Sequence, residues 1–401
     1  MRLAILALSV LLCSPAESRA DCILNDLIIV RSGQDVIGTS GADRIECLTD
    51  HYGSIIAGAG ADRVLVDAGV TMTGAIDAGT GSDSIVLREG SRLTGLLDAG
   101  SGANSLRLDG AVLDSGVKAA AGPDRLRVSG AVSIAGRVQL GGGRNVVAIR
   151  EASLSTSGGP DGPWGGITSG GRGTRAFFVN SQLQAVSQSG EHSAPPARFA
   201  FECRRRCSLT AKNAVFDDFT VGFGGGRNSL RLFGGTRAVR AYMAQGRNSA
   251  LVARQAQADL LRGGAGRDRF IIRGSASTVE GGPGADDILV SGHGASAQAV
   301  AGGHWSGGTA WSDEDDVAAV CSEASVGYLS AARMRLMSGC EAQYALAPYG
   351  AAAATLELVN VKGLPPSSFA SPALPAELTV SRKRVRDAAA AGRYCRLGTF
   401  D

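Results

Sequence analysis

The feature that most constrains this chain is an internal repeat with a period near 20 residues. Ten copies carry a glycine-rich turn, then one aspartate or asparagine, then a short apolar run, as in AGAGADRVLV and GGAGRDRFII. A fixed period of this length is typical of solenoids, in which each copy forms one coil. We call the shared aspartate or asparagine of each copy the anchor; the anchors are Asp43, Asp62, Asp83, Asn104, Asp124, Asn145, Asn228, Asn248, Asp268 and Asp286.

Apolar side chains alternate strictly after each anchor. The residues two and four positions after it are apolar, for example Val64 with Val66 and Phe270 with Ile272. Alternation with a period of two places both side chains on one face of a β-strand. One coil cannot bury that face alone, but stacked coils bury a continuous apolar column. The repeat therefore predicts an all-β protein: a parallel β-solenoid of the right-handed β-helix type, with coils of about 20 residues.

The repeat also divides the chain. Residues 1–20 are expected to be a secretory signal peptide, with a basic start, an apolar run and small residues before the cleavage point. Residues 21–316 are expected to form the solenoid, with a Gly/Pro-rich insertion near residues 155–175. The pattern changes from about residue 317, so we expect residues 317–401 to be the C-terminal cap that a solenoid needs. No later segment has the length of apolar sequence that a membrane span requires.

The cysteines are consistent with export, since disulfides form and persist outside the reducing cytosol. Secretion or transfer to the periplasm would leave seven of the eight cysteines in the mature chain. Connectivity does not follow from sequence. Pairing by proximity predicts Cys22–Cys47, Cys203–Cys207 and Cys321–Cys340, with Cys395 left over or displacing one of these partners.

Two copies of the repeat resemble a known family. The segments GGAGRDRFI from Gly263 and GGPGADDIL from Gly281 fit the nonapeptide of the hemolysin-type calcium-binding (RTX) repeats, which belong to bacterial extracellular proteins. In that family, turn carbonyls and the aspartate carboxylate bind calcium, which takes six to eight oxygen ligands. The resemblance implies Ca²⁺ as a cofactor. The ligand candidates are Asp268 and Asp286 with the turns at Gly263 and Gly281, followed by Asp62, Asp83 and Asp43.

A second interpretation of the anchors needs no metal. Stacked carboxylates about 4.8 Å apart repel one another, and asparagine at Asn104, Asn145, Asn228 and Asn248 or adjacent arginine relieves that repulsion. Arginine flanks seven of the anchors, as at Arg44, Arg144 and Arg247. In this interpretation the anchors form a ladder that stabilises tight turns through hydrogen bonds with backbone N–H groups.

For function, we expect an exported, non-catalytic solenoid with a structural or surface-binding role and a polysaccharide or a cell-surface protein as partner. A net charge of +3 gives no electrostatic case for nucleic acid. The alternative is a β-helix polysaccharide lyase or glycoside hydrolase, since hydrolysis of that kind uses paired carboxylates. Its candidate residues are the pairs Asp217–Asp218 and Asp286–Asp287, His293 in a Gly-His-Gly segment, and the tryptophans Trp164, Trp305 and Trp311.

Overall fold

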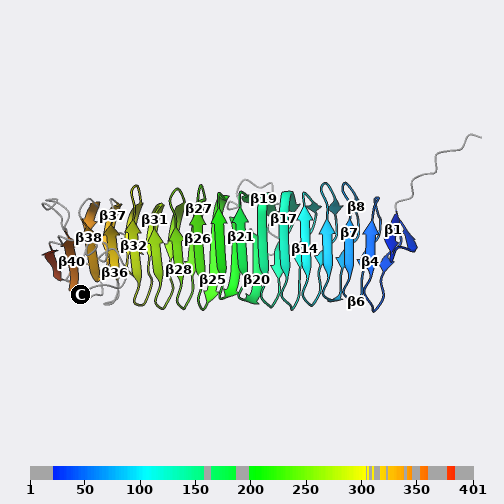
Figure 1. The fold of residues 1–401 in the computed structure, drawn as a ribbon, viewed down its shortest axis with the longest axis horizontal. Coiled ribbons are helices and arrows are strands. Elements are labelled where there is room, and N and C mark those ends of the chain that lie inside the picture. The colour runs from blue at the N-terminus through cyan, green and yellow to red at the C-terminus, as the bar shows by residue number, and fades with distance from the viewer. Residues whose placement is uncertain are drawn as a thin grey trace, which may run out of the picture.

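The chain forms one elongated stack of β-coils, seen in a computed structural model (Figure 1). The structure describes residues 21–157, 164–186, 198–303, 305–306, 309–310, 317–321, 324–337, 341–345, 353–359 and 377–383. All regular elements in these ranges are strands. Successive coils pair in parallel, and each coil adds one strand to each of a few long ladders, which confirms the predicted parallel β-solenoid. None of the described residues lies in a helix of the length and apolarity that a membrane span requires.

The longest ladder, which we call ladder A, contains the strand that follows each anchor. Apolar side chains stack in register along it, as in Ile45–Val64–Ile85–Leu106, and these four are fully buried. Its strands are β4 (Arg44–Cys47), β7 (Arg63–Val66), β11 (Ser84–Leu87), β14 (Ser105–Asp109), β17 (Arg125–Ile134), β19 (Val146–Ser157), β21 (Arg175–Val179), β24 (Ser208–Lys212), β26 (Ser229–Phe233), β28 (Ser249–Val252), β30 (Arg269–Ile272), β32 (Asp287–Ser291), β36 (Val317–Cys321), β38 (Arg333–Met337), β40 (Ala353–Val359) and β41 (Glu377–Lys383).

The other sides of the coils change along the stack. The first coils carry two further short strands each, on separate sides, whereas from β26 onward one longer strand replaces them. The second side contains β8 (Thr71–Met72), β12 (Arg92–Leu93), β15 (Val112–Leu113) and β22 (Gln182–Val186). The third contains β3 (Val36–Ile37), β5 (Ile55–Ile56), β9 (Ile76–Asp77), β13 (Leu97–Asp98), β16 (Val117–Lys118), β18 (Val138–Leu140), β20 (Trp164–Arg172), β23 (Arg198–Arg205), β25 (Val215–Gly225), β27 (Arg237–Met243), β29 (Gln257–Arg262), β31 (Ser275–Glu280), β33 (Ser296–Ala301), β37 (Ser325–Ser330) and β39 (Glu341–Ala345).

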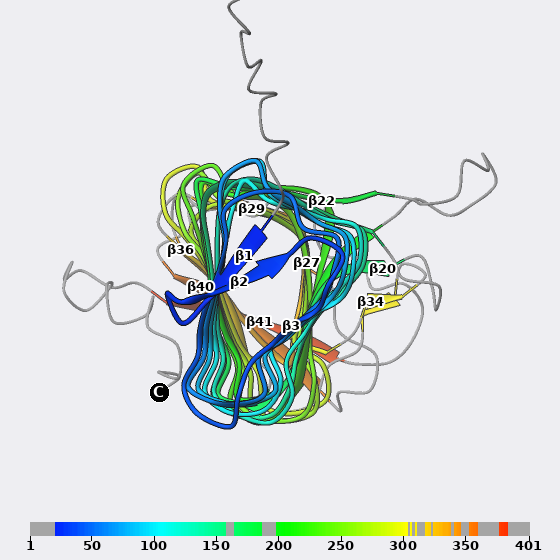
Figure 2. The same cartoon turned by 90° about the vertical axis from the view of Figure 1, so that its right-hand side faces the viewer.

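The N-terminal end of the stack is closed by an antiparallel hairpin. The strands β1 (Asp21–Leu24) and β2 (Ile28–Arg31) pair with each other, and β1 also pairs antiparallel with β4 (Figure 2). Cys22 and Cys47 lie opposite each other in this pairing and form a disulfide, as the sequence predicted. Two small sheets complete the description: β6 (Ala59–Gly60) with β10 (Thr80–Gly81), and β34 (Trp305–Ser306) with β35 (Thr309–Ala310).

Strand pairing extends into both segments that the sequence set apart from the repeats. Within residues 155–175, expected as a lateral insertion, the end of β19 and β20 pair with neighbouring coils, whereas residues 158–163 lie outside the described residues. Parallel pairing also continues past residue 317 through β36, β38, β40 and β41, so ladder A does not end where the change of composition suggested.

Candidate functional site

The anchors form a hydrogen-bonded ladder through the stack. The Oδ1 atom of an anchor accepts a bond from the backbone N–H of the anchor one coil earlier. Asp62 accepts from Asp43 at 2.8 Å, Asp83 from Asp62 at 2.9 Å, and Asp286 from Asp268 at 2.8 Å. The anchor side chains are buried, with 0–3% of their surface exposed. A buried backbone N–H without an acceptor is costly, so this ladder satisfies one donor in each of these coils.

In most anchors, the second polar atom of the side chain forms a hydrogen bond within the same coil. In Asn145, Asn228 and Asn248 the amide Nδ2 donates to the carbonyl oxygen four residues earlier, at 2.7–3.0 Å. In Asp43 and Asp268 the direction is reversed, because the carboxylate Oδ2 accepts from the backbone N–H of the residue four positions earlier. Either hydrogen bond stabilises the turn that precedes the ladder A strand of that coil.

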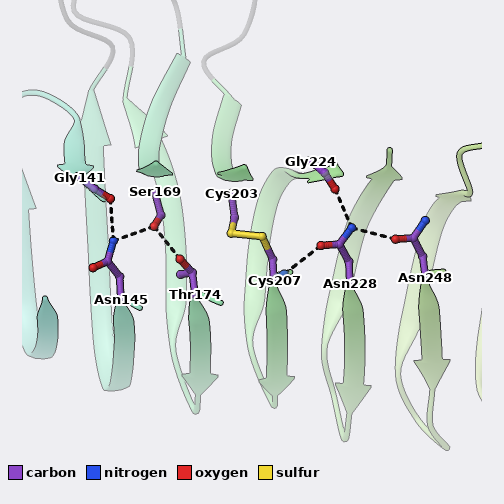
Figure 3. The surroundings of a disulfide bond; sticks show 9 residues. All are labelled: Gly141, Asn145, Ser169, Thr174, Cys203, Cys207, Gly224, Asn228 and Asn248. Carbon is purple, nitrogen blue, oxygen red and sulfur yellow. Dashed lines mark hydrogen bonds between the residues drawn. A yellow bond between two sulfur atoms is a disulfide. The ribbon is translucent and has the colours of Figure 1, made fainter. Parts of the chain in front are cut away.

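Two coils have anchors that the sequence did not reveal. Thr174 and Cys207 stand in register between Asn145 and Asn228 (Figure 3). The hydroxyls of Ser169 and Thr174 continue the chain of bonds from Asn145, while the backbone N–H of Cys207 donates to Asn228. Cys207 forms the predicted disulfide with Cys203, again four residues earlier. The disulfide thus makes covalently the link that the asparagines make by hydrogen bonds.

In Asp62, Asp83 and Asp124 the carboxylate does not make that second link. Their Oδ2 atoms are buried and have no hydrogen-bond partner among the described residues. Burial raises the pKa of each carboxyl above its usual range, despite hydrogen bonds that oppose the shift, and brings the pKa of Asp124 to about 6. Burial raises the pKa of Asp268 as well. For Asp43, burial acts in the same direction, but the hydrogen bonds from Thr39 and Asn25 together outweigh it and lower the pKa.

The residues predicted to bind calcium are all part of these turns. Asp268 uses both carboxylate oxygens in hydrogen bonds, with Asn248 and with the backbone of Gly264. A Cβ atom at Gly263 would lie 1.8 Å from the carbonyl oxygen of Gly281, so close approach of coils requires glycine there. Within the described ranges, His, Cys, Asp and Glu side chains form no group of three or more that could hold a metal ion. Calcium can also take backbone carbonyl oxygens as ligands, and calcium binding stays a prediction.

The third predicted disulfide and the enzyme candidates are only partly described. Cys321 is disulfide-bonded, but Cys340 and Cys395 lie outside the described residues. Asp286 belongs to the anchor ladder, and Asp287 forms an ion pair with Arg267 at 3.0 Å, so this pair of carboxylates is not open to solvent. The side chains of Asp217, Asp218, Trp164 and Trp305 are not described, and Trp311 lies outside the described residues.

The outer surface of ladder A carries a groove of about 550 Å³, which we call the face groove. Its floor is made by Ala148 and Val146, which are short side chains on β19. In register, Ala148 lies between Arg127 of β17 and Phe177 of β21, so longer side chains flank a short one. The groove is lined by Arg107, Asp109, Arg125, Arg127, Val128, Ser129, Val146, Ala148, Arg150 and Phe177.

The face groove is strongly basic. Its single carboxylate, on Asp109, is bound by Arg107 at 2.6 Å and by the hydroxyl of Ser129. Arg125, Arg127 and Arg150 are exposed and form no ion pair with any other described residue. The groove therefore offers three uncompensated guanidinium groups beside one aromatic ring.

A second groove of about 880 Å³, which we call the turn groove, lies at the glycine-rich turns that precede β19, β21 and β24. It is lined by Gly142, Gly143, Arg144, Gly170, Gly171, Arg172, Gly173, Thr174, Arg175, Arg206 and Ser208. A third groove, of about 740 Å³, brings His293 together with Arg254 and Arg273 and has no carboxylate in its lining.

Comparison with protein-family models, with curated proteins and with solved structures finds no match for this chain. A function must therefore be inferred from the fold and from the chemistry of the grooves.

Proposed function

We propose that this protein is an exported, non-catalytic β-solenoid that binds an extended polysaccharide along the outer surface of ladder A. The observation that carries the proposal is the face groove, which crosses four coils from β14 to β21. At about 4.8 Å per coil, this spans roughly 14 Å along the stack, enough for a few sugar rings.

The chemistry of the lining supports a glycan as the ligand. Guanidinium groups donate paired N–H groups to carboxylates and sulfates. The partly exposed ring of Phe177 offers an apolar surface against which a sugar ring can pack. The short side chain of Ala148 lies between Arg127 and Phe177, so a sugar unit of a longer chain can enter the depression between these two longer side chains.

The state of the carboxylate supports a binding role rather than catalysis. General acid–base hydrolysis needs two carboxyl groups that flank the scissile bond. The face groove holds only Asp109 among its lining residues, and Arg107 and Ser129 already bind it. Export agrees with the disulfides of the stack, which persist in oxidising compartments.

The test is a substitution that fills the groove without removing a charge. Ala148→Phe is expected to weaken polysaccharide binding at least tenfold, because it occupies the floor on the solvent side of a strand, where an aromatic residue suits β-structure. Leu251→Phe is the matched control, since Leu251 lies in the same register row of ladder A, three coils beyond Phe177. Binding to a panel of acidic and neutral polysaccharides is measured by titration calorimetry. Equal affinities for both variants, or no binding by the unaltered protein, would overturn the proposal.

The alternative, a polysaccharide lyase or glycoside hydrolase, rests on one observation. His293, Arg254 and Arg273 come from three successive coils and line the third groove together. Release of reducing ends or of unsaturated sugars from any polysaccharide that binds, lost in His293→Ala, would favour the enzyme over the binding protein.

A further inference from the structure

The turn groove lies where a column of arginines is interrupted. The residue just before the anchor is arginine in many coils, including Arg144, Arg206, Arg227 and Arg247. In the coil between Arg144 and Arg206, this place is taken by Gly173, which precedes the anchor Thr174. A position without a side chain therefore stands between two arginines that are two coils apart, about 9.6 Å along the stack.

The gap is enforced by the backbone. Gly173 has φ of +85°, a conformation that other residues rarely adopt, so the turn itself selects glycine there. Gly171 must also lack a side chain, because a Cβ atom would lie 1.9 Å from the carbonyl oxygen of Gly143. Gly142 differs from both, since a Cβ atom built on it meets no other atom within 4 Å. This glycine is not required by packing, and it lines the groove.

Four arginines surround the gap without compensation. Arg144, Arg172, Arg175 and Arg206 are exposed, and none forms an ion pair with another residue that the structure describes. No aspartate or glutamate lines the groove. Arg172 also stands directly opposite Arg205 in the pairing of β20 with β23, and like charges in such positions repel. A bound anion would remove that cost.

We propose that the turn groove binds clustered oxyanion groups, sulfate esters or carboxylates, on an acidic glycan. The planar guanidinium matches both groups through paired N–H donors, and four of them around one gap favour a ligand with two or more negative charges close together. The inference rests on the proposed polysaccharide-binding function and adds the chemical class of the ligand and a second site for it.

The experiment compares two double variants that remove equal charge. R144Q/R172Q removes two arginines of the groove, whereas R227Q/R247Q removes two exposed arginines from the same column outside it. Affinity for dextran sulfate, polygalacturonate and uncharged dextran is measured by titration calorimetry at low ionic strength, and folding is checked by thermal melting. Gly142→Gln, which keeps all four arginines and projects a side chain from the lining, is the second variant if R144Q/R172Q does not fold.

We expect R144Q/R172Q or Gly142→Gln to weaken binding of an acidic polymer about tenfold or more, and R227Q/R247Q to weaken it less than about threefold. Whether the loss is seen with dextran sulfate or with polygalacturonate identifies sulfate or carboxylate as the group bound.

Equal losses in both double variants would overturn the site, because they indicate a diffuse charge effect. Binding of uncharged dextran with the same affinity would also overturn it. If Ala148→Phe weakens binding but the turn-groove variants do not, only this inference fails; if the unaltered protein binds none of the polymers, the proposed function fails with it.

Discussion

At the scale of single residues, asparagine and aspartate have opposite consequences at an anchor. Asn104 donates its amide to the carbonyl oxygen of Gly100, which also accepts the backbone N–H of Ala120. The ionised carboxylate of Asp124 cannot donate in this way, and its Oδ2 has no hydrogen-bond partner in the part of the chain that the structure describes. A protonated carboxyl could donate as the amide does, which agrees with the raised pKa of about 6 for Asp124.

We therefore expect Asp124→Asn to stabilise the protein at pH 7 by about 1–3 kcal/mol, the cost of a buried polar atom without a partner. The folded state holds its proton on Asp124 up to about pH 6, whereas the unfolded chain loses it near the usual aspartate pKa of 3.8. Stability should thus fall as pH rises between these values, and Asp124→Asn should reduce that slope. Denaturant unfolding between pH 4 and pH 8, roughly this window and the range just above it, measures both effects.

Asp43→Asn is the control for that experiment. The Oδ2 atom of Asp43 already accepts two bonds from Thr39, and its pKa is lowered. In Asp43→Asn, the amide Nδ2 would face the N–H and hydroxyl donors of Thr39. We therefore expect this variant to be less stable at pH 7. If both variants change stability in the same direction, the account of the anchors is wrong.

At the scale of elements, the strands of ladder A could be predicted but two of their anchors could not. The spacing of Val64 and Val66 indicates a strand, its buried face and its register, because a slip by one residue would turn both side chains away from the core. Thr174 and Cys207 lack the glycine-aspartate motif, since a hydroxyl or a disulfide holds the turn as well as an amide does. The sequence pattern identifies only aspartate and asparagine anchors, whereas the fold also accepts a hydroxyl or a disulfide at the anchor position.

The grooves could not be predicted from the sequence for a related reason. Ala148 forms a groove floor, and Gly173 a gap between arginines, only because longer side chains lie beside them in the neighbouring coils. Those neighbouring residues are 20 or more positions away in the chain. A single shift in coil length changes which arginine meets which small residue. The lengths of the coils around β19 to β24 vary, so register had to be known first.

The hydrogen bonds in the turns lead to a prediction for the effect of calcium on thermal stability. Both oxygens of Asp268 are occupied by hydrogen bonds, so we expect millimolar Ca²⁺ to raise the melting temperature by less than about 10 °C relative to a chelator. Differential scanning calorimetry with and without Ca²⁺ measures the shift, with Asp268→Ala as the paired variant. A larger shift that disappears in Asp268→Ala or Asp286→Ala would instead establish the calcium sites that the RTX-like turns imply.

At the scale of the whole molecule, the anchor ladder and the grooves belong to different surfaces of the same coils. The anchors point inward, where their side chains are almost fully buried, and they hold successive turns in register. Register in turn aligns the outward side chains, so that Arg107, Arg127, Ala148 and Phe177 form one row across the stack. The strands of ladder A lie side by side along the elongated stack (Figure 1). A buried ladder thus positions the exposed, basic surface that we propose to bind a glycan.

The most direct test of that claim is an arginine footprint. The unaltered protein is treated with an arginine-specific dicarbonyl reagent, with and without a bound acidic polysaccharide, and modification is measured peptide by peptide. We predict protection of Arg125, Arg127, Arg144 and Arg175, which line the two grooves, and no change at Arg227 and Arg247, which are exposed in the same stack but outside both. Equal protection of all six arginines, or of none while the polymer is bound, would contradict the account.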